Sequence, residues 1–364
     1  MQKLFEEYRM SITPLTPIHV GSGEEIMPGD YFIFDEKGRH ILYAVDMGYL
    51  GSKLLQGRET LCKWITDDKK PFEWMKKVRD NRSLATMIRK YARFRSSVTS
   101  TVAAEINQRW GTGVSRLGIN VLQRPVADPI IPGSSIKGAI RTALLYSAVP
   151  KPLDRAPTDD RHVSGWERVQ LGSLSDRIND DLLRHLKIAD AAAKGVVTEI
   201  LDAEHVGMRD KGGAQAELID YRECLPGVLE DGEHYALETS LVIASGHPHH
   251  RRSRGRVRRE SILEACRNFY GAVMEADEQY WRGDREVLDV YREIRAALEK
   301  TPGAAPIRLG WGCGMDSISL NLAKPPGRQT PGRKDFRFRY NPRTRRVLDG
   351  LYPPGWAMFA LEAV

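Results

Sequence analysis

Residues 131–141 read IPGSSIKGAIR, a turn followed by the start of a helix. Pro132-Gly133 is typical of a turn, and Ser134 or Ser135 is well suited to cap the helix, because its hydroxyl accepts a backbone N–H at the helix N-terminus. Apolar residues then recur at four-residue spacing, which predicts a helix that packs on a sheet. They are Ile136, Ile140 and Leu144.

The same stretch carries groups that suit an anionic ligand. Lys137 and Arg141 lie four residues apart and therefore project from one helix face, and Gly138 between them lets another backbone approach. Backbone N–H groups, hydroxyls and cations at a helix N-terminus are what a phosphodiester needs. An ordinary capped helix with two solvated cations is the alternative. A nucleotide P-loop is disfavoured, because Ala139-Ile140 stands where that motif requires Lys followed by Ser or Thr.

Two further glycine-containing stretches lie far from this one. LTPIHVGSG occupies residues 15–23 and RLGWGCG occupies residues 308–314. With PGSSIKGAIR between them, they resemble, in the same order, the motifs of the RAMP proteins, the RNA-binding subunits of CRISPR effector complexes. A long insertion separates the first two stretches here, whereas they follow each other closely in the repeating backbone subunit. The pattern resembles most the RAMP subunit that caps the type III-A (Csm) filament at the crRNA 3′ end.

The resemblance implies a ferredoxin-like (RRM-like) α+β core with large, mostly helical insertions. It implies a non-catalytic crRNA-binding subunit of a type III-A CRISPR ribonucleoprotein that serves antiviral defence and is needed for crRNA 3′ maturation. The implied partners are crRNA, other RAMP backbone subunits of the Csm complex and a trimming nuclease. No catalytic residue, cofactor or metal is expected.

The expected RNA-binding residues come from the three motifs and from an arginine-rich loop. They are His19, Gly21, Ser22, Gly23, Gly133, Ser134, Ser135, Lys137, Gly138, Arg141, Arg251, Arg252, Arg254, Arg256, Arg258, Arg259, Gly310, Gly312 and Gly314. For the last three glycines, a tight strand bend is an equally good interpretation. A dinucleotide-binding site is disfavoured there, because G-x-G-x-x-G is missing.

The composition is that of a globular protein with room for a large core. The chain has 364 residues, 41% of them hydrophobic and 28% charged, and a formal net charge of +7. No run approaches the roughly 18 apolar residues of a membrane span, and residues 1–7 lack the apolar region of a signal peptide. We therefore expect a cytoplasmic protein. The 4 cysteines are too far apart for a zinc site or a disulfide framework.

Hydrophobic periodicity places the expected elements. Residues 8–20 predict a first strand interrupted by prolines, residues 31–34 and 41–45 predict a β-hairpin, and residues 47–110 change to a helical period. The later elements are expected as strands at 187–192, 196–201 and 235–243, two helices between 262 and 298, and a closing strand at 356–363.

This order is typical of a ferredoxin-like core with insertions. We expect residues 1–46 and 119–245 to form the first part of the RRM-like core and residues 47–118 a mostly helical insertion. Residues 246–364 should add a basic loop, two helices, the glycine-rich loop and the closing strand. No RNP1-type aromatic strand is visible, so RNA binding should rest on backbone contacts, with bases read by pairing to a target.

Two residues support enzymatic alternatives. His19 precedes a flexible glycine loop, and a RAMP relative that processes CRISPR repeats uses a histidine near its first strand in a metal-independent nuclease site. No second acid or base lies nearby in the sequence, which favours a histidine that stacks or hydrogen-bonds. Asp30 lies near the place where the backbone RAMP subunit carries its target-cleaving aspartate. Its context, Pro28-Gly29-Asp30-Tyr31, leads directly into a strand and favours a turn residue.

Residues 247–259 read HPHHRRSRGRVRR, with six arginines in nine residues. Such a run repels itself unless an anion is present, which favours phosphate contact. A metal site at its histidines is disfavoured by Pro248 and the adjoining arginines. A second basic face is expected on the 47–110 segment, at Arg82, Arg89, Lys90, Arg93 and Arg95. A charge run of this kind is usually a solvated face, with RNA contact or a protein partner as the alternatives.

Overall fold

We analysed a computed structural model of the chain. It describes residues 4–53, 58–67, 73–109, 117–153, 160–173, 175–208, 214–231, 235–248, 250, 257–326, 339–340, 342 and 344–364. The statements below concern these residues.

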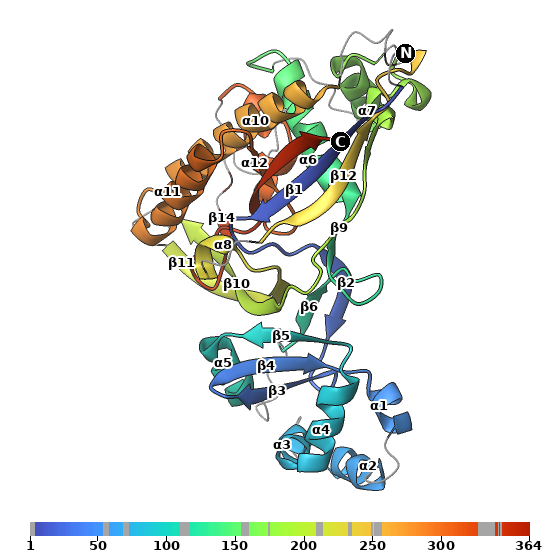
Figure 1. The fold of residues 1–364 in the computed structure, drawn as a ribbon. Coiled ribbons are helices and arrows are strands. Elements are labelled where there is room, and N and C mark those ends of the chain that lie inside the picture. Colours follow the sequence, from blue (N-terminus) through green and yellow to red (C-terminus); the bar gives the residue numbers. More distant parts are fainter. Residues whose placement is uncertain are drawn as a thin grey trace.

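The upper part of the molecule is built on a five-stranded sheet with the order β13-β15-β1-β12-β8 (Figure 1). Its strands are β1 (Glu6–Pro14), β8 (Leu186–Ile188), β12 (Leu237–Ile243), β13 (Ala305–Arg308) and β15 (Trp356–Ala363). Each neighbouring pair is antiparallel. When β13 at the edge is left out and the other four strands are numbered in chain order, the fourth, first, third and second lie side by side. This is the ferredoxin-like order, and it confirms the predicted fold class.

Two helices complete this ferredoxin-like core. Helix α6 (Gly133–Ala148) follows the first strand and α10 (Arg259–Tyr280) follows the third. Residues that alternate along β1, such as Met10 and Ile12, are fully buried and share one apolar core with both helices. The predicted stripe of α6 belongs to this core through Ile136 and Ile140. On the opposite face of β1 and β12 the side chains are Arg9, Ser11, Thr13, Glu238, Ser240 and Val242, none of them aromatic.

The other helices lie around this core. They are α7 (Asp160–Gln170), α8 (Val228–Asp231), α11 (Arg285–Lys300) and α12 (Gly314–Ile318), with the 3-10 turns η1 (Ile178–Asp180), η2 (Leu182–His185) and η3 (Asn321–Ala323). The segment at 178–185 forms two successive 3-10 turns. It is broken at Asp181, whose extended backbone ends one turn and whose side chain accepts from the Leu183 N–H at the start of the next.

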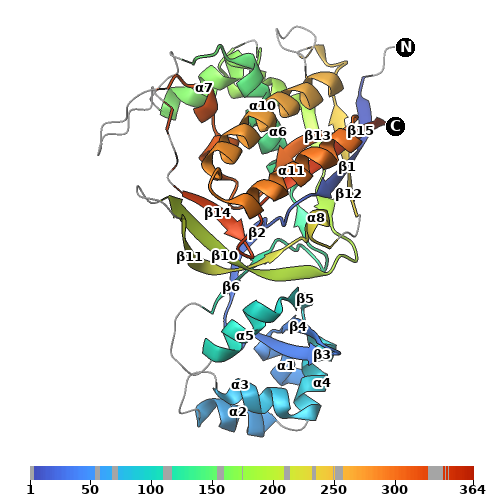
Figure 2. The same cartoon turned by 90° about the vertical axis from the view of Figure 1, so that its left-hand side faces the viewer.

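A long ribbon crosses below the core (Figure 2). It consists of β10 (Thr198–Met208) and β11 (Ala214–Cys224), and β14 (Thr344–Leu348) pairs with β10. The sheet continues in the order β2-β6-β11-β10-β5-β4-β3 into a lower lobe. The other strands are β2 (Gly21–Ile26), β3 (Tyr31–Glu36), β4 (Arg39–Ala44), β5 (Phe94–Val98) and β6 (Ile119–Leu122), with β7 (Ile130–Ile131) paired to β9 (Ala191–Ala192).

The lower lobe has its own apolar core, to which the ribbon contributes Ile200 and Tyr221. Its helices are α1 (Met47–Lys53), α2 (Arg58–Thr66), α3 (Glu73–Asp80), α4 (Arg82–Tyr91) and α5 (Ser100–Arg109). The predicted hairpin is confirmed as β3–β4, and it packs in this lower core rather than against β1. The expected boundary at residue 46 therefore differs from the boundary between the two cores.

Candidate nucleic-acid interface

The first motif runs from the end of β1 to the exposed start of strand β2, which is a correction, because a flexible loop was expected at Gly21–Gly23. Leu15 and Thr16 are buried and donate their backbone N–H groups to the Trp356 carbonyl, at 2.8 and 3.1 Å. Gly21, Ser22 and Gly23 are exposed. The motif thus has a buried half that fixes its path and an exposed half that is available to a ligand.

His19 lies in the buried half. Its side chain is 2% exposed, and its Nδ1 lies 2.6 Å from the Glu223 carbonyl oxygen. Burial is the main cause that lowers the pKa of His19 to about 4. This is the hydrogen-bonding role that the sequence favoured. Because the imidazole is buried and hydrogen-bonded, we interpret His19 as a residue that fixes the backbone beside it.

The third motif packs directly on the first. Trp311 donates its backbone N–H to the His19 carbonyl oxygen at 2.8 Å. Gly310 has φ +85°, and a Cβ there would lie 2.2 Å from the same oxygen. A residue with a side chain would therefore force the two motifs apart. Gly310 and Gly314 are exposed, whereas Gly312 is partly buried. The loop therefore combines a tight backbone bend with exposed backbone.

The second motif also depends on a close backbone approach. A Cβ at Gly133 would lie 2.1 Å from the Ile188 carbonyl oxygen, and the Gly133 N–H donates to Asp190 Oδ1 at 2.8 Å. The expected serine cap is wrong. The N-cap is Pro132, and no side chain caps it, because α6 begins earlier than predicted and Ser134 and Ser135 lie within its first turn. Ser134 is exposed and Ser135 partly buried.

Lys137 and Arg141 are both engaged within the protein. Lys137 Nζ donates to the Leu186 carbonyl oxygen at 2.9 Å, and its partial burial lowers its pKa. Arg141 pairs with Glu167 at 3.0 Å. Gly138 is exposed, and a Cβ there would meet open space. The helix surface at Gly138 is therefore open, between the two cations.

The three motifs converge at one end of the ferredoxin-like sheet. In the β-sheet register Pro14 pairs with Ala357 and Arg308 with Trp356, so the first and third motifs leave the sheet at the same end. The second motif joins them through Gln123, which donates its backbone N–H to Val20 and accepts one from Ile130 just before α6. Residues separated by nearly 300 positions thus form one surface.

A buried acid supports this surface from below. Glu223 is fully buried and accepts hydrogen bonds from Ser96 Oγ at 3.0 Å, from Thr198 Oγ1 at 2.5 Å and from the Leu122 N–H at 3.0 Å. Arg124 forms an ion pair with it. Because the Glu223 carbonyl also holds His19, this pair links β6, β10 and β11 to the first motif.

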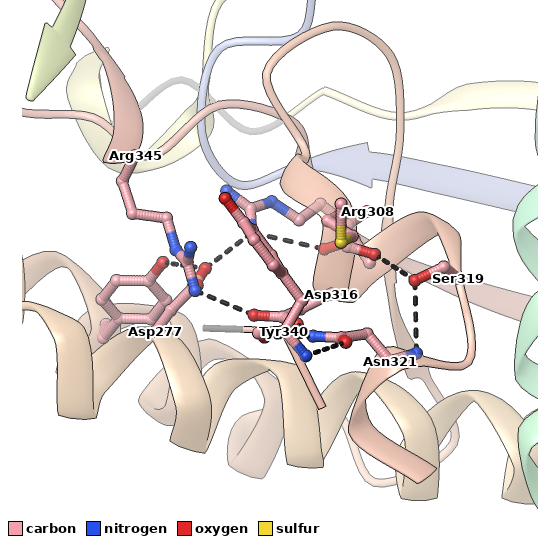
Figure 3. A network of polar contacts seen from close by, with 10 residues as sticks. Asp277, Arg308, Asp316, Ser319, Asn321, Tyr340 and Arg345 are labelled. Atoms are coloured by element: carbon pink, nitrogen blue, oxygen red, sulfur yellow. Dashed lines mark hydrogen bonds and ion pairs between the residues drawn. The ribbon is translucent and has the colours of Figure 1, made fainter. Parts of the chain in front are cut away.

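A second buried network fixes the glycine-rich loop at both ends (Figure 3). Arg308, just before the loop, pairs with Asp277 of α10 at 2.6 Å. Asp316, just after it, pairs with Arg345 of β14 at 2.9 Å, and Arg345 also pairs with Asp277 at 2.8 Å. All four side chains are less than 10% exposed. Asn321 adds a hydrogen bond to Asp316 at 2.6 Å.

Two guanidinium groups lie against the only aromatic ring of the glycine-rich motif. The Cζ atoms of Arg222 and Arg346 are 3.8 and 4.9 Å from the centroid of the Trp311 ring. Arg222 pairs with Asp220 at 2.5 Å. The sequence reasoning missed Arg124, Arg222, Glu223 and Arg346, since each stands apart from the motifs in sequence. The one sequence signal for this cluster was Trp311, an aromatic residue inside a glycine-rich motif.

The structure describes two arginines of the arginine-rich loop, Arg258 and Arg259. Arg251, Arg252, Arg254 and Arg256 lie outside the described residues. Arg258 is exposed, and Arg259 donates from Nε to the Leu361 carbonyl oxygen at 2.9 Å. The three motifs lie at the Trp356 end of β15, whereas Leu361 lies near the other end of this strand, where it pairs with Met10 of β1. The structure therefore does not bring Arg258 and Arg259 together with the three motifs.

The basic face of the lower lobe is partly neutralised. Arg82, Arg89, Lys90, Arg93 and Arg95 are exposed, as predicted. Arg89 pairs with Glu36 at 2.8 Å and Arg93 with Glu24 at 2.6 Å.

Within the described ranges, no group of three or more His, Cys, Asp or Glu residues is arranged to hold a metal ion. No described helix is long and apolar enough to cross a membrane.

Comparison with known families adds to this geometry. The model of the RAMP superfamily matches residues 11–315, a range that contains all three motifs. The chain belongs to the RAMP superfamily.

Relatives of this RAMP chain include the "CRISPR system Cms protein Csm5" of Streptococcus thermophilus. The two are 24% identical over 205 residues, which is 52% of this chain and 53% of that protein. The chain thus spans about half the length of this curated relative. A chain in the cryo-EM structure of a Csm–crRNA–target RNA ternary complex of a type III-A CRISPR-Cas system is 20% identical, with a TM-score of 0.62, and the match covers 98% of this chain and 100% of that one.

The crystal structure of T. onnurineus Csm5 gives a similar result. It is 19% identical with a TM-score of 0.58, and the match covers 95% of this chain and 99% of that one. At these identities the structural likeness establishes the fold, which agrees with the predicted ferredoxin-like core.

Proposed function

We propose that this chain is a crRNA-binding subunit of a type III-A CRISPR ribonucleoprotein. The observation that carries the proposal is the convergence of the three motifs at one end of the sheet. Membership in the RAMP superfamily and the likeness to Csm5 support it. The likeness to a chain of the Csm–crRNA–target RNA complex supports crRNA and other Csm subunits as partners.

The finer role that we propose is to cap the backbone filament at the crRNA 3′ end. The long insertion between the first and second motifs supports it, because this insertion builds the lower lobe below the shared surface (Figure 1). Such a subunit is needed for crRNA 3′ maturation and interference, and a trimming nuclease is then a further partner. We expect it to act in the cytoplasm.

The contacts at this surface suit the RNA backbone. The exposed groups at the convergence are glycine backbone, Ser22 and Ser134, and Lys137 and Arg141 follow further along α6. Such groups bind phosphate and sugar, which carry no sequence information. We propose that the bases stay free to pair with a target RNA.

The proposal includes no catalytic role. The buried His19, with a lowered pKa and a hydrogen bond to Glu223, is poorly placed to take a proton from a ribose hydroxyl. Asp30 has the predicted turn geometry: its N–H donates to the Met27 carbonyl at 2.8 Å, and its Oδ2 accepts from the Met27 N–H at 3.2 Å. These contacts tie the Asp30 carboxylate to its own turn.

The test is reconstitution of the Csm complex with and without this chain. We expect the complex that contains it to hold crRNA with a protected 3′ end and the complex without it to carry longer or ragged 3′ ends. Repeat RNA incubated with the isolated chain in EDTA should remain intact, and so should target RNA incubated with it and Mg²⁺. Cleavage that disappears in His19→Ala or Asp30→Asn would contradict the non-catalytic role.

A further inference from the structure

We propose that Arg346, positioned by Trp311, binds a phosphodiester group of single-stranded RNA beside the glycine-rich loop. The inference rests on the proposed RNA-binding function and adds a contact that none of the three motifs contains.

The Trp311 ring is a fixed platform. It packs against a small apolar cluster that includes Leu201 and Leu348 on the ribbon and β14. Its backbone N–H is held by the His19 carbonyl at 2.8 Å. A guanidinium group that stacks on a fixed ring loses much of its rotational freedom, and the ring attracts the cation. The guanidinium group of Arg346 is therefore already oriented before a ligand binds.

The charges around this platform are not balanced. Arg222 is 9% exposed, is paired with Asp220, and has a buried Nε without a hydrogen-bond partner. Arg346 is partly exposed and makes no ion pair with any residue in the described ranges. Of the two guanidinium groups that lie against the ring, only that of Arg222 has a carboxylate partner among the described residues, so the charge of Arg346 is not neutralised by an ion pair there. An anion at this place would relieve the repulsion.

The backbone on both sides of the site is held in place. Arg345, directly before Arg346, is locked by Asp277 and Asp316 inside the molecule. Asp277 also holds Arg308 at the start of the glycine-rich loop. A shift of Arg346 relative to the loop would have to break these buried pairs, which is strongly unfavourable because it leaves uncompensated buried charges. The cation and the loop therefore form one rigid unit.

The surroundings leave room for a chain to approach. Gly310 and Gly314 are exposed, and a Cβ at Gly314 would meet open space. A phosphodiester is the chemistry that fits, because a guanidinium presents paired N–H donors to its oxygens. Since the Trp311 ring is already occupied by guanidinium groups, it is not available to stack on a base. Recognition here should be independent of base identity.

The experiment measures binding of the full-length chain to 15-nucleotide oligouridine and oligocytidine across a salt series. Arg346→Ala should lower the affinity for both oligonucleotides about tenfold. The slope of log affinity against log salt should decrease by about 0.7, as expected for one lost phosphate contact on a single strand. Arg292→Ala is the matched control: Arg292 is an exposed arginine of α11 paired with Asp289, and its loss should leave both quantities unchanged.

The positioning role of Trp311 is tested by a double-mutant cycle. Trp311→Phe keeps an aromatic ring and should retain most of the affinity, whereas Trp311→Ala should lose as much as Arg346→Ala. The double variant should lose little more than either single one. Additive losses would contradict positioning by Trp311, and thermal melting of each variant shows whether it is folded.

The outcomes separate this inference from the proposed function. If the unmodified chain and its Csm complex bind no RNA, the proposed function fails. If the unmodified chain binds but Arg346→Ala keeps its affinity and salt slope, only the present inference is overturned. A loss confined to one of the two oligonucleotides would also overturn it, because it would show recognition of a base.

Discussion

His19 Nδ1 lies 2.6 Å from the Glu223 carbonyl oxygen, although the two residues are 204 positions apart. The carboxylate of the same Glu223 is held by Arg124. One residue of β11 thus fixes the backbone of the first motif through its carbonyl and the β6–β7 connection through its side chain. The exposed glycines at 21–23 are positioned by this buried contact.

The first prediction concerns pH. The pKa of His19 is lowered from 6.5 to about 4 in the folded chain, so the unfolded chain binds the proton more readily between these values. Its contribution to the free energy of unfolding is therefore complete above about pH 6.5 and is lost as the pH falls towards 4, by roughly 2–3 kcal/mol. His19→Asn should lack this component, as measured by urea unfolding at pH 7 and pH 4.5. If the unmodified chain and His19→Asn lost the same free energy of unfolding between pH 7 and pH 4.5, this prediction would be contradicted.

The second prediction concerns the buried pairs behind the glycine-rich loop. Asp277→Ala leaves Arg308 and Arg345 with one buried carboxylate between them. We expect it to lower the free energy of unfolding by about 3–5 kcal/mol. Asp289→Ala removes an acid from an exposed pair on α11 and should change stability by less than about 1 kcal/mol. Urea denaturation measures the free energy of unfolding of both variants. Equal effects of Asp277→Ala and Asp289→Ala would show that the buried network contributes little to stability.

The third prediction concerns the cations of α6. Lys137→Ala with Arg141→Ala should weaken guide-RNA binding at least tenfold and decrease the salt slope by about 1.4, for two lost phosphate contacts on a single strand. Glu167→Ala is the control, because it frees Arg141 from its ion pair without removing the charge. It should leave the affinity unchanged or increase it. Filter binding measures the affinity and the salt slope, and circular dichroism shows whether each variant is folded. An unchanged affinity in the double variant would exclude this face of α6 as an RNA contact.

The ferredoxin-like fold was predictable because its strands and helices carry their periodicity locally. β12 alternates, and α6 shows its apolar stripe. The helical period expected over residues 47–110 is interrupted, since α4 ends at Tyr91 and Phe94 already belongs to β5. Apolar spacing alone cannot separate a helix end from a following strand, because both bury the same residues.

The candidate site was predictable only in part. Glycines such as Gly133 and Gly310 stand out in the sequence, and the structure gives the reason: another backbone approaches each of them closely. The residues that hold the motifs together, Glu223 and Asp277, lie on distant elements and belong to no motif. The same holds for Arg346. Pairing between distant charged residues is decided by tertiary structure, so no local pattern reveals it.

The last prediction separates folding from binding at Gly138. This glycine is exposed within α6, and a Cβ there would meet open space. Because alanine favours a helix over glycine, Gly138→Ala should raise the free energy of unfolding by about 0.5–1 kcal/mol. If an RNA backbone approaches α6 here, the added methyl group should nevertheless weaken guide-RNA binding several-fold. Gly271→Ala in α10 also adds a Cβ in open space, and it should stabilise the chain without changing RNA affinity. Urea unfolding and filter binding on both variants give the four values needed. Unchanged affinity in Gly138→Ala, with the stability gain present, would place the RNA elsewhere than over this turn of the helix.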